Sequence, residues 1–250
     1  MKKNLIILFA LILCLPGFIF SDLVTFKVGF FMPHAMSDLW EIEFENMSYT
    51  KPQFQNTNFA FGYEYFVSRE FSVVMSVDPY TKNKSGIYND YVGEVIDDIF
   101  YAFNYGTGDP ISHVFSVTST PLQASLKLTP LGRKGKAIPF VGGGVGVYLW
   151  TVRIQGDMVD FDAGEEFIDL DLDAIVIGYP AYAVDAREEN KLSFGFHVFG
   201  GVMLPIANRI SVEGEVKYNR VNGAFKDGFI GFEPFDLGGL TISLGMNYWF

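Results

Sequence analysis

The chain has 250 residues, a formal net charge of −11 and 49% hydrophobic residues. This acidic balance argues against nucleic-acid binding, which needs a basic footprint. The single cysteine, Cys14, lies in the leader described next, so no disulfide framework is expected. Aromatic residues make up 17% of the chain and there are 26 glycines, a composition that favours a sheet with many rings and tight turns.

The first 21 residues have the pattern of a secretory signal peptide. Two lysines precede an apolar run from Leu5 to Leu15, and the small residue Ser21 stands where cleavage is expected. The apolar run is too short to span a bilayer as a helix. We therefore expect residues 1–21 to be removed and residues 22–250 to form a single domain.

Side chains after the leader alternate between apolar and polar or small in eight segments. Alternation with a period of two predicts a β-strand with one apolar and one polar face. The predicted strands are residues 23–33, 57–66, 71–78, 111–128, 138–152, 191–204, 210–220 and 235–250. Pro121 falls inside the fourth of them, so a bulge or bend is expected there.

The connections between these strands alternate in length. Those after the second, fourth and sixth strands are short, whereas the segments 32–56, 79–110, 153–190 and 221–234 are long. Short turns at one end and long loops at the other are typical of transmembrane barrels. Within 79–110, Val92, Val95, Ile96 and Ile99 have helical spacing, so we predict a short helix over residues 91–103.

Charged side chains share one face of the predicted strands with glycines and small polar residues. They are Lys27, Glu64, Glu213, Glu215 and Lys217. On a lipid-facing surface a midplane lysine costs roughly 2–4 kcal/mol, so these groups are expected inside the barrel. Because a lone buried charge is costly, Lys27 should pair with Glu64 at similar height or with a carboxylate of strand 210–220. The network is then a structural filling or, in the alternative, a salt-bridge gate in a narrow pore.

Four segments carry a resemblance to a known family: TPLQASLKL (120–128), IPFVGGGVGVY (138–148), LSFGFHVFGGVMLPI (192–206) and the closing LGMNYWF (244–250). Together with the leader and the alternating loop lengths, they resemble the small eight-stranded outer-membrane β-barrels that include the OmpA-type transmembrane domain, OmpX and OmpW. The resemblance implies an all-β, antiparallel up-and-down transmembrane barrel of eight strands, or ten if the long loops add two.

The same resemblance implies a location in the outer membrane of a Gram-negative-type bacterium. Both chain ends would then be periplasmic, and the barrel surface would contact outer-membrane lipid and lipopolysaccharide. It also implies that Tyr248 and Phe250 form the terminal signal read by the barrel-assembly machinery during biogenesis.

The segment 153–190 is rich in carboxylates that could hold Ca²⁺ or Mg²⁺, both of which prefer hard oxygen ligands. The candidate ligands are Asp157, Asp160, Asp162, Asp169, Asp171 and Asp173. The alternative is a solvated acidic face. The alternation from Asp169 to Asp173 predicts that the neighbouring strands extend into a hairpin above the membrane.

The histidines decide whether the chain is expected to be an enzyme. There are three, His34, His113 and His197, and Ser112, Ser116 and Ser119 lie near His113 in sequence. No acid at strand spacing is evident to orient His113, so we predict no catalytic residues and no cofactor beyond the Ca²⁺ or Mg²⁺ considered above. The function predicted is an envelope-structural or surface-interaction barrel with acidic external loops. A small channel for ions or hydrophobic molecules is the alternative.

Overall fold

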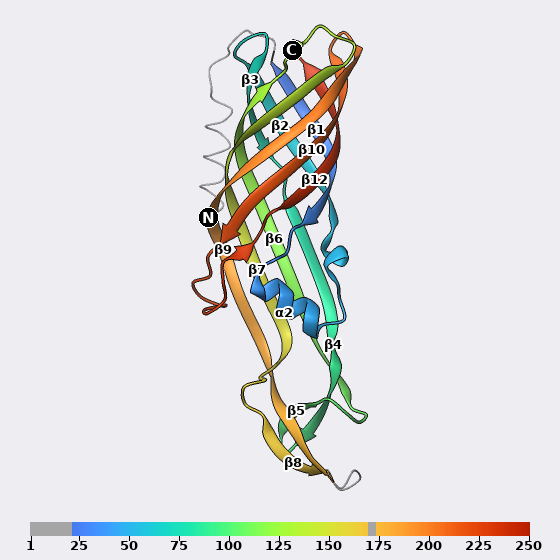
Figure 1. Ribbon diagram of the computed structural model, residues 1–250, viewed down its shortest axis with the longest axis vertical. Coiled ribbons are helices and arrows are strands. Elements are labelled where there is room, and N and C mark those ends of the chain that lie inside the picture. The colour runs from blue at the N-terminus through green and yellow to red at the C-terminus, as the bar shows by residue number, and fades with distance from the viewer. Residues whose placement is uncertain (1–21, 170–173) are drawn as a thin grey trace.

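The computed structural model describes residues 22–169 and 174–250, and the predicted signal peptide lies outside these residues. Within them the chain forms an elongated antiparallel barrel with a small helix near one mouth (Figure 1). The elements are β1 (Leu23–Pro33), α2 (Asp38–Asn46), the 3-10 helix η1 (Lys51–Phe54), β2 (Asn56–Phe66), β3 (Phe71–Val77), β4 (Tyr80–Ile96), β5 (Ile99–Phe103), β6 (Asp109–Leu128), β7 (Ile138–Val159), β8 (Glu165–Asp169), β9 (Ala174–Ala207), β10 (Ile210–Gly223), β11 (Phe235–Asp236) and β12 (Gly239–Trp249).

Eight of the strands close into a ring in the order β1, β2, β3, β6, β7, β9, β10 and β12. Every neighbouring pair is antiparallel, and β12 returns to β1 with Trp249 opposite Leu23. Closure leaves no free sheet edge around the ring. The predicted antiparallel up-and-down barrel is confirmed, and the pairings β6–β4, β4–β5 and β5–β9 join further strands to the ring.

The two ends of the barrel differ as the loop lengths predicted. Residues 67–70, 129–137 and 208–209 are tight connections that lie at the end where the chain terminates, which we call the short-turn end (Figure 1, top). At the opposite, long-loop end, β4, β6, β7 and β9 continue beyond the ring as two long hairpins (Figure 1, bottom). The sheet of the ring therefore continues into an extension, the projecting sheet, that reaches far from the ring.

The predicted helix over residues 91–103 is wrong, because this segment is a β-hairpin. Val92 to Ile96 of β4 pair with Ile99 to Phe103 of β5. The turn residues Asp97 and Asp98 have φ of 49° and 66°, and two positive φ values are what a tight two-residue hairpin turn requires. The helical spacing of the apolar residues was therefore not a reliable indicator of a helix. The Asp97-Asp98 pair between two apolar runs indicates the hairpin turn instead.

Pro121 introduces no bulge into its own strand. It keeps an unbroken register with β7, opposite Tyr148. The interruption lies in the neighbouring strand, where β3 ends at Val77 and β4 begins at Tyr80. Proline has no N–H to donate, so it is tolerated beside a neighbour that makes no ladder hydrogen bond at that level.

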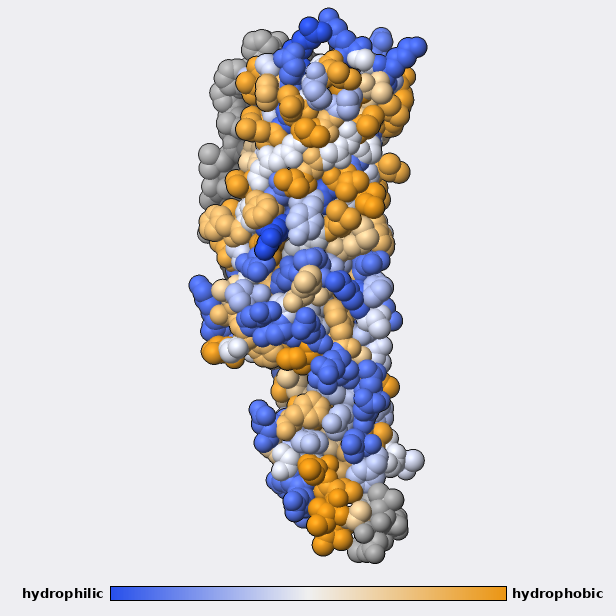
Figure 2. All heavy atoms as spheres, in the orientation of Figure 1, coloured by the Kyte–Doolittle hydropathy of each residue, from blue (hydrophilic) through white to orange (hydrophobic). Residues whose placement is uncertain are grey.

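The outer surface divides into an apolar and a polar part. Exposed side chains such as Phe26, Phe61, Leu126, Phe194 and Leu244 surround the ring, and Figure 2 shows apolar residues gathered over this upper half and polar residues around α2. We call the exposed apolar surface around the ring the apolar belt. Among the described residues, no helix combines the length and apolar character needed to cross a membrane.

Candidate functional site: the filled lumen

The lumen is closed at the short-turn end by apolar side chains. The buried cluster consists of Leu23, Ile138, Phe140, Phe199 and Met203. Two glycines make room for its rings: a Cβ at Gly142 would lie 2.3 Å from the Phe199 ring, and one at Gly201 would lie 2.6 Å from the Phe140 ring. Gly142 and Gly201 therefore leave space for these two rings in a narrow interior.

A layer of charge lies next to this cluster. The Lys27 ammonium is 2.6 Å from Glu215 Oε2 and 2.8 Å from Glu213 Oε1. The structure thus places Lys27 between two carboxylates of β10, one of the alternatives predicted. The expectation that Lys27 and Glu64 share a height is wrong, because the register sets Glu64 opposite Leu23 and Lys27 opposite Ala60.

Glu64 pairs with a different cation, Lys127 of β6, which is separated from β2 only by β3. Its Oε2 is 2.8 Å from Lys127 Nζ, its Oε1 accepts from the Ser72 hydroxyl at 2.6 Å, and Arg133 lies 3.9 Å away. The same Lys127 ammonium sits 4.0 Å from the centroid of the Phe140 ring, a cation–π contact. Lys127 and Arg133 were missed as network members, although the alternation already placed Lys127 on the inward face.

A third layer is polar and contains Lys217, the remaining predicted charge. Lys217 Nζ is 3.1 Å from Asp78 Oδ2 and donates to Gln123 at 3.0 Å. The Gln123 amide donates in turn to Asn219 at 2.8 Å and to the Tyr148 hydroxyl at 2.9 Å. Asp78 was assigned to a strand end in the sequence and not recognised as the counter-ion.

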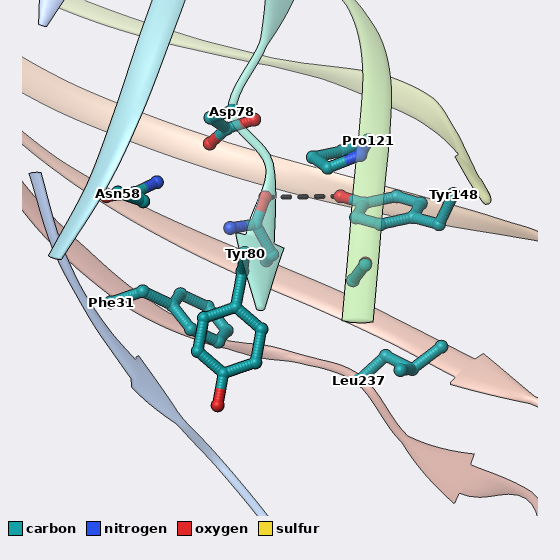
Figure 3. A pocket seen from close by; sticks show the side chains of 9 residues that line it. Phe31, Asn58, Asp78, Tyr80, Pro121, Tyr148 and Leu237 are labelled. Atoms are coloured by element: carbon teal, nitrogen blue, oxygen red, sulfur yellow. Dashed lines mark hydrogen bonds between the residues drawn. The ribbon is translucent and has the colours of Figure 1, made fainter. Parts of the chain in front are cut away.

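A small cavity lies beside this polar layer. It has a volume of about 20 Å³, and Figure 3 shows it between Phe31, Asn58, Asp78, Tyr80 and Tyr148. A single water needs roughly 10–15 Å³ of such volume, so the cavity has room for about one water molecule. It is therefore far too small to serve as a conduction path.

Aromatic side chains fill the lumen at the long-loop end. Trp40 of α2 is 1% exposed, and its ring lies 5.0 Å from the rings of Phe54 and Phe115 and 5.1 Å from that of Phe235. The cluster joins rings from β1, β4, β6, β7 and the loop before β12. We call residues 34–55, with α2 and η1, the plug, since they close this mouth from the first long connection.

Polar contacts fasten the plug to the last long connection. Asp38 N–H donates to Glu233 and Glu233 N–H donates to Asp38, each at 2.9 Å. The Trp40 indole donates to the Asp236 carbonyl at 3.0 Å, and His34 Nδ1 lies 3.0 Å from the Asp236 carboxylate. Segments nearly 200 positions apart in sequence are thus joined across the mouth.

His113 has an acidic partner that the sequence did not reveal. Its Nε2 lies 2.9 Å from Glu43 of α2, its Nδ1 lies 3.3 Å from the Asp157 carbonyl, and the Tyr49 hydroxyl also donates to Glu43. The sequence shows no acid at strand spacing near this histidine; its partner Glu43 comes instead from helix α2, to which strand spacing does not apply. Burial raises the pKa of Tyr49, and Glu43 raises it further, so the phenol stays protonated.

This arrangement does not resemble a nucleophile and its base. His113 is 3% exposed, and Ser112 and Ser116 lie on the opposite face of β6. Ser119 shares the inward face but stands six positions away, roughly 20 Å along the strand. His197 lies among lumen residues and contacts the Ser125 hydroxyl at 2.6 Å.

The predicted cation ligands are spread along the far hairpin. Asp157 is in β7, Asp160 and Asp162 are in the following turn, where Asp162 N–H donates to Asp160 at 3.1 Å, and Asp169 ends β8. Asp171 and Asp173 lie outside the described residues. Over 22–169 and 174–250, no three His, Cys, Asp or Glu side chains are grouped to hold a metal ion. Cation binding stays a prediction.

The closing strand presents two rings outward at the short-turn end. Tyr248 and Phe250 are 43% and 63% exposed, and their ring centroids are 5.2 Å apart. Trp249 between them turns inward, and its indole donates to Ser211 at 2.9 Å. The predicted assembly signal is therefore accessible from outside the barrel.

The fold and the filled, polar interior define the class: a small transmembrane-type β-barrel whose polar and charged side chains face inward. The resemblance stated from the sequence holds at the level of fold. No family model and no curated protein sequence matches the chain. Solved structures do, among them the following three.

Neisserial surface protein A is 13% identical, with a TM-score of 0.45, over 92% of this chain and 97% of that one. The N-terminal barrel domain of Pseudomonas aeruginosa OprF is 8% identical, with a TM-score of 0.41 and coverages of 92% and 97%. Ail of Yersinia pestis is 10% identical, with a TM-score of 0.43 and coverages of 92% and 100%. At these values, the roles of residues in those proteins do not transfer to this chain.

Proposed function

We propose that this chain is a sealed, non-enzymatic outer-membrane barrel that carries an acidic surface on its long hairpins. The observation that supports the seal is the succession of layers in the lumen: an apolar cluster, two charged and polar layers, and an aromatic plug. Lys27 and Lys217 of the predicted network, and Lys127 beside them, each have a carboxylate within 3.1 Å. A lumen filled in this way is the usual interior of an eight-stranded barrel.

Conductance in planar bilayers tests the seal. The wild-type chain, refolded and checked by its heat-dependent gel migration, should show no steady current, while a porin inserted in the same membrane conducts. Steady single-channel conductance of the wild type would overturn the seal and favour the channel alternative. Replacing Lys27 by alanine should leave the bilayer silent, because the apolar cluster and the plug remain on either side of it.

The apolar belt supports placement in the membrane, with lipid and lipopolysaccharide around the ring. Exposed apolar residues such as Phe194 (83%) and Leu244 (74%) are costly in water and suit hydrocarbon. In this placement the short-turn end faces the periplasm, where Tyr248 and Phe250 would meet the assembly machinery. The long hairpins then project outside the cell.

Single cysteines test this orientation cleanly, since the only native cysteine is in the predicted leader. Asp98→Cys lies in the turn of the β4–β5 hairpin, and Lys134→Cys lies in a short turn. A membrane-impermeant maleimide added to intact cells should label the first and not the second. The reverse pattern would invert the proposed topology.

Through its acidic hairpins the protein stabilises the envelope: external carboxylates share divalent cations with lipopolysaccharide phosphates. The supporting observation is the exposure of Asp160, Asp162, Glu165 and Glu166 at the far end of the molecule. Binding of the nanodisc-embedded protein to lipopolysaccharide should increase with Ca²⁺ and fall when these four residues are neutralised. Binding independent of Ca²⁺ would contradict this role.

A further inference from the structure

A groove opens on the projecting sheet, away from the lumen. The pairing of β4 with β6 shifts register between Ile87 and Val92, so residues 88–91 leave the ladder. Facing this bulge is the loop from Phe103 to Pro110, which joins β5 to β6. Bulges re-aim side chains that a regular strand would alternate, and here residues of the bulge and of this loop together line one space.

The groove has a volume of about 390 Å³, within the range of roughly 300–1,000 Å³ that small-molecule pockets take. Its lining combines flat rings with polar side chains: Tyr88, Tyr91, Phe103 and Tyr105, together with Asn89, Asp90 and Asn104. Tyr88 and Phe103 are buried and form its floor, while Tyr91 and Tyr105 are half-buried. Asp90 and Asn104 are exposed at its rim.

Contacts behind the groove hold these side chains in place. The Tyr91 ring rests 5.2 Å from Phe161 and 6.0 Å from Tyr179, and the Asn89 amide donates to the Met47 carbonyl at 3.0 Å. Burial raises the pKa of Tyr91, and Tyr179 and Asp90 add to the effect, so its hydroxyl remains a donor. A site fixed before binding loses less entropy when a ligand enters.

We propose that this groove binds a neutral saccharide. A sugar ring presents an apolar C–H face that packs on tyrosine and phenylalanine rings, and its hydroxyls both donate and accept hydrogen bonds. Asp90 accepts such bonds, whereas the Asn104 amide can donate and accept. The neighbouring Asp90, Glu94 and Asp109 carboxylates and the net charge of −11 act against anionic sugars. On the tight loop side, Gly106 has a φ of +87° and nothing within 4 Å of its Cβ position, which leaves the groove open there.

The test uses the protein in phospholipid nanodiscs, free of sugar-based detergents. Saturation-transfer NMR with maltose, cellobiose and diacetylchitobiose as probes should show saturable binding of at least one of them. Tyr91→Ala and Tyr105→Ala should each lower its affinity about three- to tenfold, as expected for loss of a stacked ring. Tyr182→Ala removes a tyrosine that is 52% exposed on β9 and serves as the matched control.

Three results would overturn the site: no saturable transfer from any of the three sugars, equal binding of an anionic sugar such as glucuronate, or affinity unchanged in both groove variants. Asp90→Asn gives a second readout, because it should preserve neutral binding while relieving the exclusion of glucuronate. The inference relies on the proposed function only for exposing the groove outside the cell. Sugar binding, current and maleimide labelling are separate measurements, so failure of one is distinguishable from failure of the others.

Discussion

Replacing Lys27 by methionine is the most direct test of the charge layer. Methionine keeps the length and volume of the side chain but removes the ammonium between Glu213 and Glu215. These carboxylate side chains are only 1% and 5% exposed. Removing one partner of a buried ion pair leaves the other charge without compensation, which costs about 3–5 kcal/mol. We expect the free energy of unfolding to fall by about this amount.

The contacts also predict which of the two carboxylates accounts for most of the lost stability. Glu213 keeps the Asn247 amide at 3.0 Å and Lys127 at 3.9 Å, whereas Glu215 loses its 2.6 Å partner. The double variant Lys27→Met, Glu215→Gln should therefore recover most of the stability. Neutralising both sides of a buried pair is often nearly neutral.

Urea titration of tryptophan fluorescence in lipid vesicles measures these differences. Arg153→Met is a suitable control, because it removes a salt bridge with Asp185 at 2.7 Å whose side chains are 35% and 45% exposed. Such an exposed pair contributes about 1 kcal/mol or less. The reasoning fails if Lys27→Met costs no more than Arg153→Met, or if adding Glu215→Gln brings no recovery.

Three further predictions follow from the packing and from a rim carboxylate. Trp40→Ala should cost about 3–5 kcal/mol through the cavity it leaves and should expose the plug to limited proteolysis; an uncut plug would contradict its packing role. Gly201→Val should impair folding, because a Cβ there would lie 2.1 Å from the Gly214 carbonyl oxygen and 2.6 Å from the Phe140 ring; a variant that still gives the heat-modifiable gel band of the wild type would contradict this. Burial raises the pKa of Glu188, but Lys191 and three backbone N–H groups outweigh it and hold the pKa below its ordinary value of 4.5. Because this pKa is lowered, the ionised carboxylate stabilises the fold above about pH 4.5, and this stabilisation is lost as the pH falls through the folded-state pKa. In Glu188→Gln the free energy of unfolding should therefore depend less on pH in that acid range, with no change in its pH dependence elsewhere.

The ring could be predicted from the sequence because its signal is local. Each ring strand must show one face to the apolar exterior and one to the lumen, so every second residue reports its position. The first strand, residues 23–33, was predicted with the bounds of β1, and the turn at 67–70 separates β2 from β3 as expected. Beyond the ring this constraint weakens, and there the hairpin of β4 and β5 was taken for a helix.

Partner choice inside the lumen could not be predicted in the same way. Whether Lys27 meets Glu64 or Glu215 depends on the stagger between strands, which alternation leaves open. A shift of four residues, about 13 Å along a strand, separates the level of Glu64 from that of Lys27. The acid that contacts His113 comes from α2. The sequence indicates the start of this helix only weakly, by Ser37 before an acidic first turn.

The plug and the groove place different demands on the projecting sheet. The plug uses the concave side of the strands, where Trp40, Phe115 and Phe235 exclude water and give the hairpins a core that a bare two-stranded ribbon lacks. With that core in place, β4 can leave its ladder at residues 88–91 without unfolding, because Tyr88 remains anchored by the Val159 N–H at 3.3 Å. The proposed seal and the proposed groove therefore share residues: Tyr88, which lines the groove, belongs to the same buried aromatic cluster as Trp40 of the plug.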